Sequence, residues 1–135
     1  MTTEENKSIV RRFNKEFIEG GDMAAFDEII SPDFINHTAP PGTPTGGEGV
    51  VYFFNHMLKP AFSQFTVEIH DQVAEGDLVT TRKSFHGVHT GEFFGVPASD
   101  RAVKMDVIDI IRLRDGRFVD HWGILDMQNV IAQIS

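Results

Sequence analysis

Apolar residues recur at helical spacing through the first third of the chain. They fall on one side of the expected first helix: Ile9, Val10, Phe13 and Phe17. A repeat of three to four positions marks a buried helix face. Thr2 followed by Glu5 is typical of a capping box at a helix start, and Gly20-Gly21 stops the helix. The pattern therefore predicts one helix over this part of the chain.

Two shorter helices are expected next. Asp22 is placed to cap a helix that Ser31-Pro32 ends, because proline disfavours helical backbone in the residue before it. A short apolar-polar segment follows at 33–37, and a third helix is expected from about Gly47 to Leu58. The Pro- and Gly-rich segment 39–47 between them is either a connector or a mobile rim over a pocket.

The period changes to two in the second half, which is typical of strands. Four strands are expected, over 65–74, 78–89, 101–114 and 117–126. Asp115-Gly116 is a strong signal for a tight hairpin between the last two. Residues 127–134 form either a short closing helix or an extra strand. Three helices followed by a four-stranded meander predict an α+β fold. A strongly bent antiparallel sheet would wrap around the N-terminal helices and leave a conical cavity at one end.

Composition narrows the class of protein. A chain of 135 residues suits one domain over 1–135. Lysine and arginine number 12 against 20 aspartates and glutamates, so the net charge of −8 argues against nucleic acid or anionic membrane as a partner. The absence of cysteine excludes disulfides and thiolate sites. The N-terminus has no apolar signal core, and no run approaches the ~20 apolar residues of a membrane helix, so we expect a cytoplasmic location.

The last hairpin carries candidate chemistry. A regular two-residue turn would pair Asp109 with Trp122 and Met105 with Asp126. One face would then carry Met105, Val107, Asp109, Ile111, Leu113, Phe118, Trp122, Ile124 and Asp126. A carboxyl on an apolar face has a raised pKa unless it is paired, and such a group suits general acid/base catalysis.

Each of these carboxyls also has a structural interpretation. Asp109 is either a pocket group or the cap of a bend, or it pairs with an arginine such as Arg82 or Arg112. Asp126 is either a sheltered acid/base or the N-cap of a closing helix, because it directly precedes residues 127–134.

The histidines do not indicate a metal site, and we expect none. The six occupy positions 37, 56, 70, 86, 89 and 121 without an HExxH motif. His37, beside the presumed cavity mouth, is either a loop histidine that bonds backbone or a pocket group that binds a substrate oxygen. His121 has the opposite parity to Asp126, so it faces the pocket only if the strand is bulged, for example at Gly123. Otherwise it lies on the far face.

Two motifs carry a resemblance to a known family. They are GVHTGEFFG at 87–95 and DGRFVDHWGILD at 115–126, supported by ENKSIVRRF and PPGTPTGG earlier in the chain. Together they resemble the SnoaL-like polyketide cyclases, or ester cyclases, of the nuclear-transport-factor-2-like superfamily, over nearly the whole chain. Lys83 stands where that family often has an aromatic residue.

The resemblance implies an α+β cone with a hydrophobic pocket and no metal or organic cofactor. Its characterised members close a ring of a polyketide by intramolecular aldol condensation. The family's acid/base, an aspartate near the end of the last strand, matches Asp126, and a polar group near the first loop matches Asn36 or His37. A histidine from the sheet matches His121 or His89.

These observations lead to a mechanistic hypothesis. Asp126 would remove a proton from a methylene flanked by two carbonyls, and Asp126 or His37 would protonate the alkoxide formed when the enolate attacks a ketone of the same molecule. We expect Asp126→Asn to abolish turnover without unfolding the protein. The expected substrate-binding residues are Asn36, Asp109, His121, Trp122, Phe53, Phe54 and His89.

Two other functions stay open. One is a related proton-transfer enzyme: an isomerase, a dehydratase, or an epoxide hydrolase in which Asp109 and Asp126 share a water. The other is a non-catalytic protein that binds a small hydrophobic molecule. In each case the expected partner is small and aromatic or polyketide-like. Apolar residues such as Ile108 and Ile110 on the outer sheet face favour a homodimer.

Overall fold

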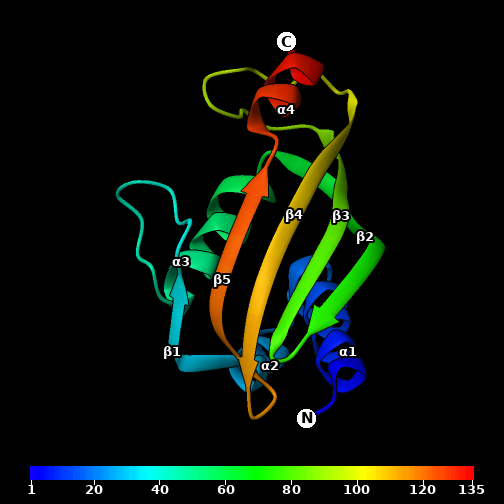
Figure 1. Cartoon of the computed structure of the whole chain (residues 1–135). Coiled ribbons are helices and arrows are strands. Elements are labelled where there is room, and N and C mark those ends of the chain that lie inside the picture. The colour runs from blue at the N-terminus through cyan, green and yellow to red at the C-terminus, as the bar shows by residue number, and fades with distance from the viewer.

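The computed structural model describes residues 1–135 as a mixed α+β fold in which helices lie against one side of a bent sheet (Figure 1). The elements in chain order are α1 (Thr3–Phe13), η1 (Asn14–Glu19), α2 (Met23–Ile29), β1 (Ile30–Asn36), α3 (Gly47–Tyr52), η2 (Phe53–Leu58), β2 (Phe62–Glu75), β3 (Leu78–His89), β4 (Ala102–Arg114), β5 (Arg117–Leu125) and α4 (Met127–Ile134). The α+β class predicted from the sequence is confirmed.

The three expected helices are present, and the caps predicted for the first two are formed. Thr2 and Glu5 form a reciprocal capping box at the start of α1, and Asp22 accepts from two backbone N–H groups at the start of α2. The first and third helices each finish in a π-helical segment, η1 and η2. The closing segment is the helix α4 rather than a strand. No helix is long and apolar enough to span a membrane.

The sheet has the strand order β1-β5-β4-β3-β2. Strands β2 to β5 form the predicted antiparallel meander, and β1 adds a fifth strand that runs parallel to β5 (Figure 1). The sequence pattern did not predict β1, because Pro32 interrupts it and suggests a break. Proline is tolerated here because β1 lies at the edge of the sheet, where a missing N–H costs little.

The β4–β5 hairpin begins as predicted. Asp115 and Gly116 have φ values of 52° and 77°, and both are positive as a type I′ turn requires. Leu113 pairs with Phe118 directly above the turn, in the expected register.

One residue later the register changes. Arg112 pairs with Asp120 instead of Val119, so β5 contains an extra residue at this bulge. An extra residue reverses the inward and outward positions of the strand beyond it. Asp109 therefore pairs with Gly123 and not with Trp122. Every side chain of β5 from Asp120 onward lies on the face opposite to the one that a regular hairpin predicts.

The core between the helices and the sheet is rich in aromatic side chains. The buried phenylalanines are Phe13, Phe17, Phe26, Phe34, Phe54, Phe62, Phe85, Phe93 and Phe118. Many contact one another, as in the pair Phe13 and Phe118, with ring centroids 4.8 Å apart. This aromatic packing leaves few polar groups on the inner face of the sheet.

Candidate functional site

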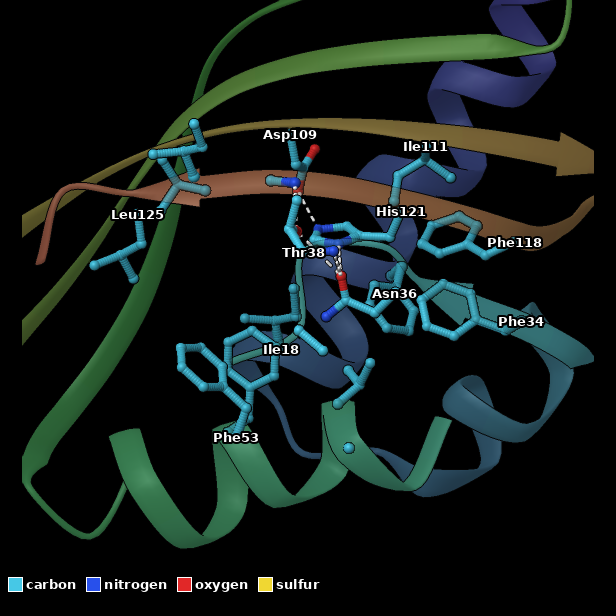
Figure 2. Close-up of a pocket in the computed structure, with 18 of the residues that line it drawn as sticks. Ile18, Phe34, Asn36, Thr38, Phe53, Asp109, Ile111, Phe118, His121 and Leu125 are labelled. Carbon is cyan, nitrogen blue, oxygen red and sulfur yellow. Dashed lines mark hydrogen bonds and ion pairs between the residues drawn. The ribbon is translucent and has the colours of Figure 1, made fainter. Parts of the chain in front are cut away.

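A cavity of about 380 Å³ lies between the inner face of the sheet and the helices. Its volume lies within the range of small-molecule sites. Most of its lining is hydrophobic and includes Phe53 and Phe54, two of the residues that the sequence analysis expected to bind substrate. Ala39, Pro40 and Pro44 also line it, so the Pro- and Gly-rich segment borders this cavity. Figure 2 shows Asp109 and His121 on the sheet facing apolar residues from the helices, such as Ile18 and Phe53.

His121 is held at the wall of this cavity by the end of β1 (Figure 2). Its Nδ1 lies 2.8 Å from Asn36 Oδ1. The Thr38 backbone N–H donates to the same oxygen at 3.1 Å, and the Thr38 hydroxyl lies 3.2 Å from it. The Thr38 hydroxyl in turn accepts from the backbone N–H of Gly123 on β5, which ties the loop to the strand.

These contacts select the tautomer of His121. The backbone donor of Thr38 identifies the Asn36 atom as the amide oxygen, and that oxygen only accepts. Nδ1 of His121 must therefore carry a hydrogen, which leaves the lone pair of the neutral imidazole on Nε2. The base position of His121 is thus directed away from Asn36 and towards Asp109, whose Oδ2 is 3.8 Å from Nε2.

A buried ion pair lies beside His121. Asp109 on β4 and Lys83 on β3 are only 5% and 3% exposed, and Asp109 Oδ2 is 2.8 Å from Lys83 Nζ. Lys83 Nζ also donates to Asn14 Oδ1 at 2.8 Å. The Asn14 amide donates in turn to the backbone carbonyl of Val10, which fixes its orientation. Asp109 therefore pairs with a lysine from the neighbouring strand, not with Arg82 or Arg112 as the sequence suggested.

The surroundings of Asp109 act on its charge in opposite directions. Burial raises the pKa of Asp109 and is the largest single influence, but the charge of Lys83 and the contact with His121 together outweigh it and hold that pKa below its ordinary value. The carboxylate is therefore charged at neutral pH. Its Oδ1 is buried and has no hydrogen-bond partner, and the residue lines the cavity. A buried acceptor without a donor is costly, so this atom is ready to receive one from a bound molecule.

Gly123 makes the close approach of these groups possible. A Cβ at this position would lie 2.8 Å from His121 Cε1 and 3.2 Å from Asp109 Cβ. Any other residue would push the imidazole away from the carboxylate. The sequence analysis expected a bulge at Gly123, and the bulge instead occurs at Val119.

Asp126 was expected to be an acid/base sheltered in the cavity, and this expected position is wrong. Asp126 is exposed, and its carboxylate accepts from the backbone N–H of Asn129 as the N-cap of α4. It borders a hollow on the outer face of the sheet, not the inner cavity. The bulge at Val119 explains this outcome, because it moves Asp126 outward and His121 inward.

His37 and Trp122 also lie outside the inner cavity. Their rings stack with centroids 4.8 Å apart, and His37 Nε2 is 2.7 Å from Asp120 Oδ1. Arg112 contacts both the face of Trp122 and Asp120 Oδ2. These residues connect β1 to the outer side of the hairpin. His37 is thus neither bonded to backbone through its ring nor placed in the pocket, and Trp122 packs on the outer face.

His89 is buried against the loop that follows β3. Its Nδ1 accepts from the Ser99 backbone N–H at 3.1 Å, and its ring lies 5.4 Å from that of Phe62. It does not line the cavity, so the expected role in substrate binding has no geometric support. Of the predicted polar residues, the structure brings together Asn36, Asp109 and His121.

Sequence reasoning missed Lys83, Asn14 and Thr38 as members of the site. A signal for Lys83 was available, since alternation along β3 places it in one row with Val79, Thr81 and Phe85, all buried. Asn14 sits on the apolar side of the first helix next to Phe13 and Phe17, where an amide is unusual. The structure has no group of three or more metal-binding side chains arranged around one point.

Comparison with known proteins identifies relatives over most of the chain. It is 27% identical over 110 residues to the nogalonic acid methyl ester cyclase of Streptomyces nogalater, which covers 80% of this chain and 81% of the relative. It is 30% identical over 121 residues to the aklanonic acid methyl ester cyclase DnrD of Streptomyces peucetius, covering 84% of this chain and 79% of the relative.

Solved structures share the fold. IdmH of Streptomyces antibioticus superposes with a TM-score of 0.85 at 35% identity, over 95% of this chain and 96% of IdmH. TsrD of Streptomyces laurentii superposes with a TM-score of 0.87 at 24% identity, over 100% and 98% of the two chains, which shows a common fold. Residues 8–134 match the model of the SnoaL-like polyketide cyclase family. The chain therefore belongs to the SnoaL-like polyketide cyclases.

Proposed function

We propose that this chain catalyses a cofactor-independent, aldol-type ring closure with His121 as the acid/base. The observation that carries this proposal is the orientation of His121, whose Nε2 lies 3.8 Å from the carboxylate of Asp109 at the wall of an apolar cavity. A neutral imidazole takes a proton readily near neutral pH. The neighbouring carboxylate then stabilises the imidazolium that forms.

His121 suits this role better than Asp109. Burial raises the pKa of Asp109, but Lys83 and His121 bring it below its ordinary value, so the carboxylate has little tendency to take a proton. It can still stabilise a positive charge on His121, because Coulomb attraction is strong where water is excluded. Asn36 holds the ring by its other nitrogen, so protonation and deprotonation occur at Nε2.

The proposed reaction starts from a methylene flanked by two carbonyl groups. His121 Nε2 takes one proton from that carbon, and the electron pair of the C–H bond passes into the enolate. The enolate carbon then forms a bond to a ketone carbon of the same molecule. The resulting alkoxide takes the proton back from His121. No atoms are gained or lost, so the product is an isomer of the substrate.

The lining of the cavity supports a flat, apolar substrate. Phe53 and Phe54 border it from η2, and Phe34 and Phe118 border it from β1 and β5. The two relatives are named as methyl ester cyclases of nogalonic and aklanonic acid, and the family model is that of polyketide cyclases. We take a polyketide methyl ester as the substrate class on this basis, with the apolar walls keeping water from the enolate.

A deuterium-exchange experiment tests the proposal. Nogalonic and aklanonic acid methyl esters, the compounds in the relatives' names, would be incubated with the protein in D₂O. We expect faster deuterium uptake at the activated methylene and a new product that differs from the substrate in mass only by its deuterium, by chromatography and mass spectrometry, both dependent on His121. Exchange no faster than in buffer, together with no new product, would rule the proposal out. Exchange without a new isomer would favour an isomerase or another proton-transfer enzyme.

The other two functions are weighed by the same experiment. Epoxide opening requires Asp109 and Asp126 to share one water, and their positions on opposite faces of the sheet count against it. Binding of the ester without exchange or conversion would favour a non-catalytic binding protein.

We also propose a homodimer that forms through the outer face of the sheet. Ile108 and Ile124 are 53% and 75% exposed on neighbouring strands, and apolar groups of this size favour burial against a partner. Ile124→Asp should then convert a dimer into a monomer in sizing chromatography. A wild-type monomer would contradict the proposal. The cytoplasmic location expected from the sequence stays a prediction.

A further inference from the structure

We infer that Lys83 and Asp109 form a donor–acceptor pair that binds an enolised 1,3-dicarbonyl group of the ligand. The inference rests on the proposed function for its view of the ligand as a substrate, but the binding that it describes is measured separately. It concerns two atoms that the proton transfer at His121 does not use: a hydrogen of Lys83 Nζ and the Oδ1 atom of Asp109.

The donor is on Lys83. An ammonium group has three N–H donors. Two acceptors lie near Lys83 Nζ, namely Asp109 Oδ2 at 2.8 Å and Asn14 Oδ1 at 2.8 Å. The next close group is the Phe85 ring, whose centroid is 5.4 Å away and offers no lone pair. One hydrogen of a nearly fully buried ammonium is therefore without an acceptor, in a residue that lines the cavity.

The acceptor is on Asp109. Its Oδ2 is engaged by Lys83, whereas its Oδ1 is buried and unpartnered. The two oxygens belong to one carboxylate, so the free acceptor lies next to the ammonium. A ligand that satisfies both groups must offer a hydroxyl and a carbonyl oxygen side by side. A free carboxylate does not fit, because it lacks the hydrogen that Asp109 Oδ1 needs.

The enol of a 1,3-dicarbonyl group has this arrangement. Its hydroxyl donates to Asp109 Oδ1 while its carbonyl oxygen accepts from Lys83 Nζ. The carbonyl oxygen is one of the two atoms on which charge collects when a proton leaves, so the Lys83 ammonium that binds it also faces that charge. Lys83 lies on the inner face of β3, and its hydrogen bond to Asn14 holds the ammonium in place. It therefore faces this charge without needing to move.

Lys83 is therefore a specificity-determining residue for ligands that enolise. An aromatic side chain at this position would fill the wall but would neither pair with Asp109 nor bind an oxygen. An apolar ligand without the hydroxyl would leave both the ammonium hydrogen and Asp109 Oδ1 unsatisfied.

Two matched probes test this inference. The first is dibenzoylmethane, which is flat, largely enolic and uncharged at neutral pH, and the second is its 2,2-dimethyl derivative, in which the two methyl groups block the enol. Dissociation constants would be measured by calorimetry for the wild-type protein. We expect the enolic probe to bind at least about tenfold more tightly, the effect of one hydrogen bond to a charged group. Equal affinity for the two probes would overturn the inference without any variant.

A double variant assigns the preference to the pair. Lys83→Met/Asp109→Leu removes both charges together and keeps the side-chain volumes similar, so it avoids an unpaired buried charge. Its affinities for the two probes should differ by less than about twofold, since no charged hydrogen-bond partner remains. Lys104→Met makes the same change on an exposed lysine of β4 and should retain the wild-type preference. Retention of the preference in the double variant would refute the role of the pair.

The outcome is separable from that of the proposed reaction. A probe preference that depends on the pair, with neither deuterium exchange nor a new product from the methyl esters, would leave the enol site standing and refute the ring closure. Exchange that depends on His121, without any probe preference, would do the opposite.

Discussion

One pair of aspartate and histidine lies on each face of the β4–β5 hairpin, the outer pair being formed between the hairpin and the residue that follows β1. On the inner face, Asp109 and His121 lie 3.8 Å apart, and on the outer face His37 and Asp120 lie 2.7 Å apart. The outer pair is the closer contact, but each of its charged groups is already satisfied and partly exposed. The inner pair leaves Nε2 of His121 and the buried Oδ1 of Asp109 without a hydrogen-bond partner, in two residues that line a mostly apolar cavity. Unsatisfied polar atoms beside a cavity, and not short contacts, are the reason that the proposed function is placed on the inner face.

The carboxylates of the two pairs, Asp120 on the outer face and Asp109 on the inner face, also differ in what sets their pKa. The hydrogen bond from His37 is the main cause that lowers the pKa of Asp120, and water competes with it because the side chain is 21% exposed. For Asp109, burial raises the pKa and is outweighed by Lys83 and His121. The charge of Asp109 therefore depends on its neighbours, whereas the charge of Asp120 would persist in water alone.

The largest expected difference between the faces is in catalysis. His121→Gln should lower the rate of deuterium exchange by about 10²- to 10⁴-fold, because the general base is lost. His37→Gln, the same change on the outer face, should leave the rate within about threefold, since its ring contacts only Trp122 and Asp120. Initial rates by mass spectrometry measure both. A larger loss in His37→Gln than in His121→Gln would reverse the assignment of the two faces.

The next expected difference is in stability. Lys83→Met leaves the Asp109 charge buried without a partner and should cost about 3–5 kcal/mol in the free energy of unfolding. The double variant Lys83→Met/Asp109→Leu should recover most of that loss. On the outer face, Arg82→Met breaks an exposed ion pair with Asp71 and should cost about 0.2–1 kcal/mol. Urea denaturation of the wild-type protein and the three variants tests this order. If Lys83→Met were as stable as the double variant, the order would be contradicted.

A smaller difference is expected in the dependence of stability on pH. Burial raises the pKa of Asp109, but Lys83 and His121 lower it by more. The pKa therefore lies below that of an aspartate in the unfolded chain, about 3.9. Its contribution is then fully present above pH ~4 and is lost as the pH falls through the folded value. Unfolding free energies between about pH 5 and 3 should fall more steeply in the wild-type protein than in the double variant. Parallel curves would mean that Asp109 is not held charged in the folded state.

Sequence patterns predicted the fold better than the site, because one local irregularity in β5 changed the positions of the site residues. The turn at Asp115-Gly116 and the inward positions of β4 follow from turn chemistry and alternation, and both were predicted correctly. The bulge at Val119 leaves no signal, because valine suits a regular strand as well as a bulged one. One undetected residue then reversed the positions of His121, Trp122 and Asp126. Asn36 was predicted only through the family, since its role depends on the unpredicted strand β1.

The smallest expected effect concerns Asp126 and tests the bulge itself. Asp126→Ala should destabilise the protein by about 1 kcal/mol, because the N-cap of α4 is lost, and Asp126→Asn should cost less since asparagine also caps helices. Neither should slow deuterium exchange, because the carboxylate is exposed on the outer side of the hairpin. Thermal unfolding and exchange rates measured together separate capping from catalysis. If Asp126→Asn abolished exchange while unfolding at the wild-type temperature, the carboxylate of Asp126 and not the imidazole of His121 would be the acid/base, and the register of β5 beyond Val119 would have to be the regular one.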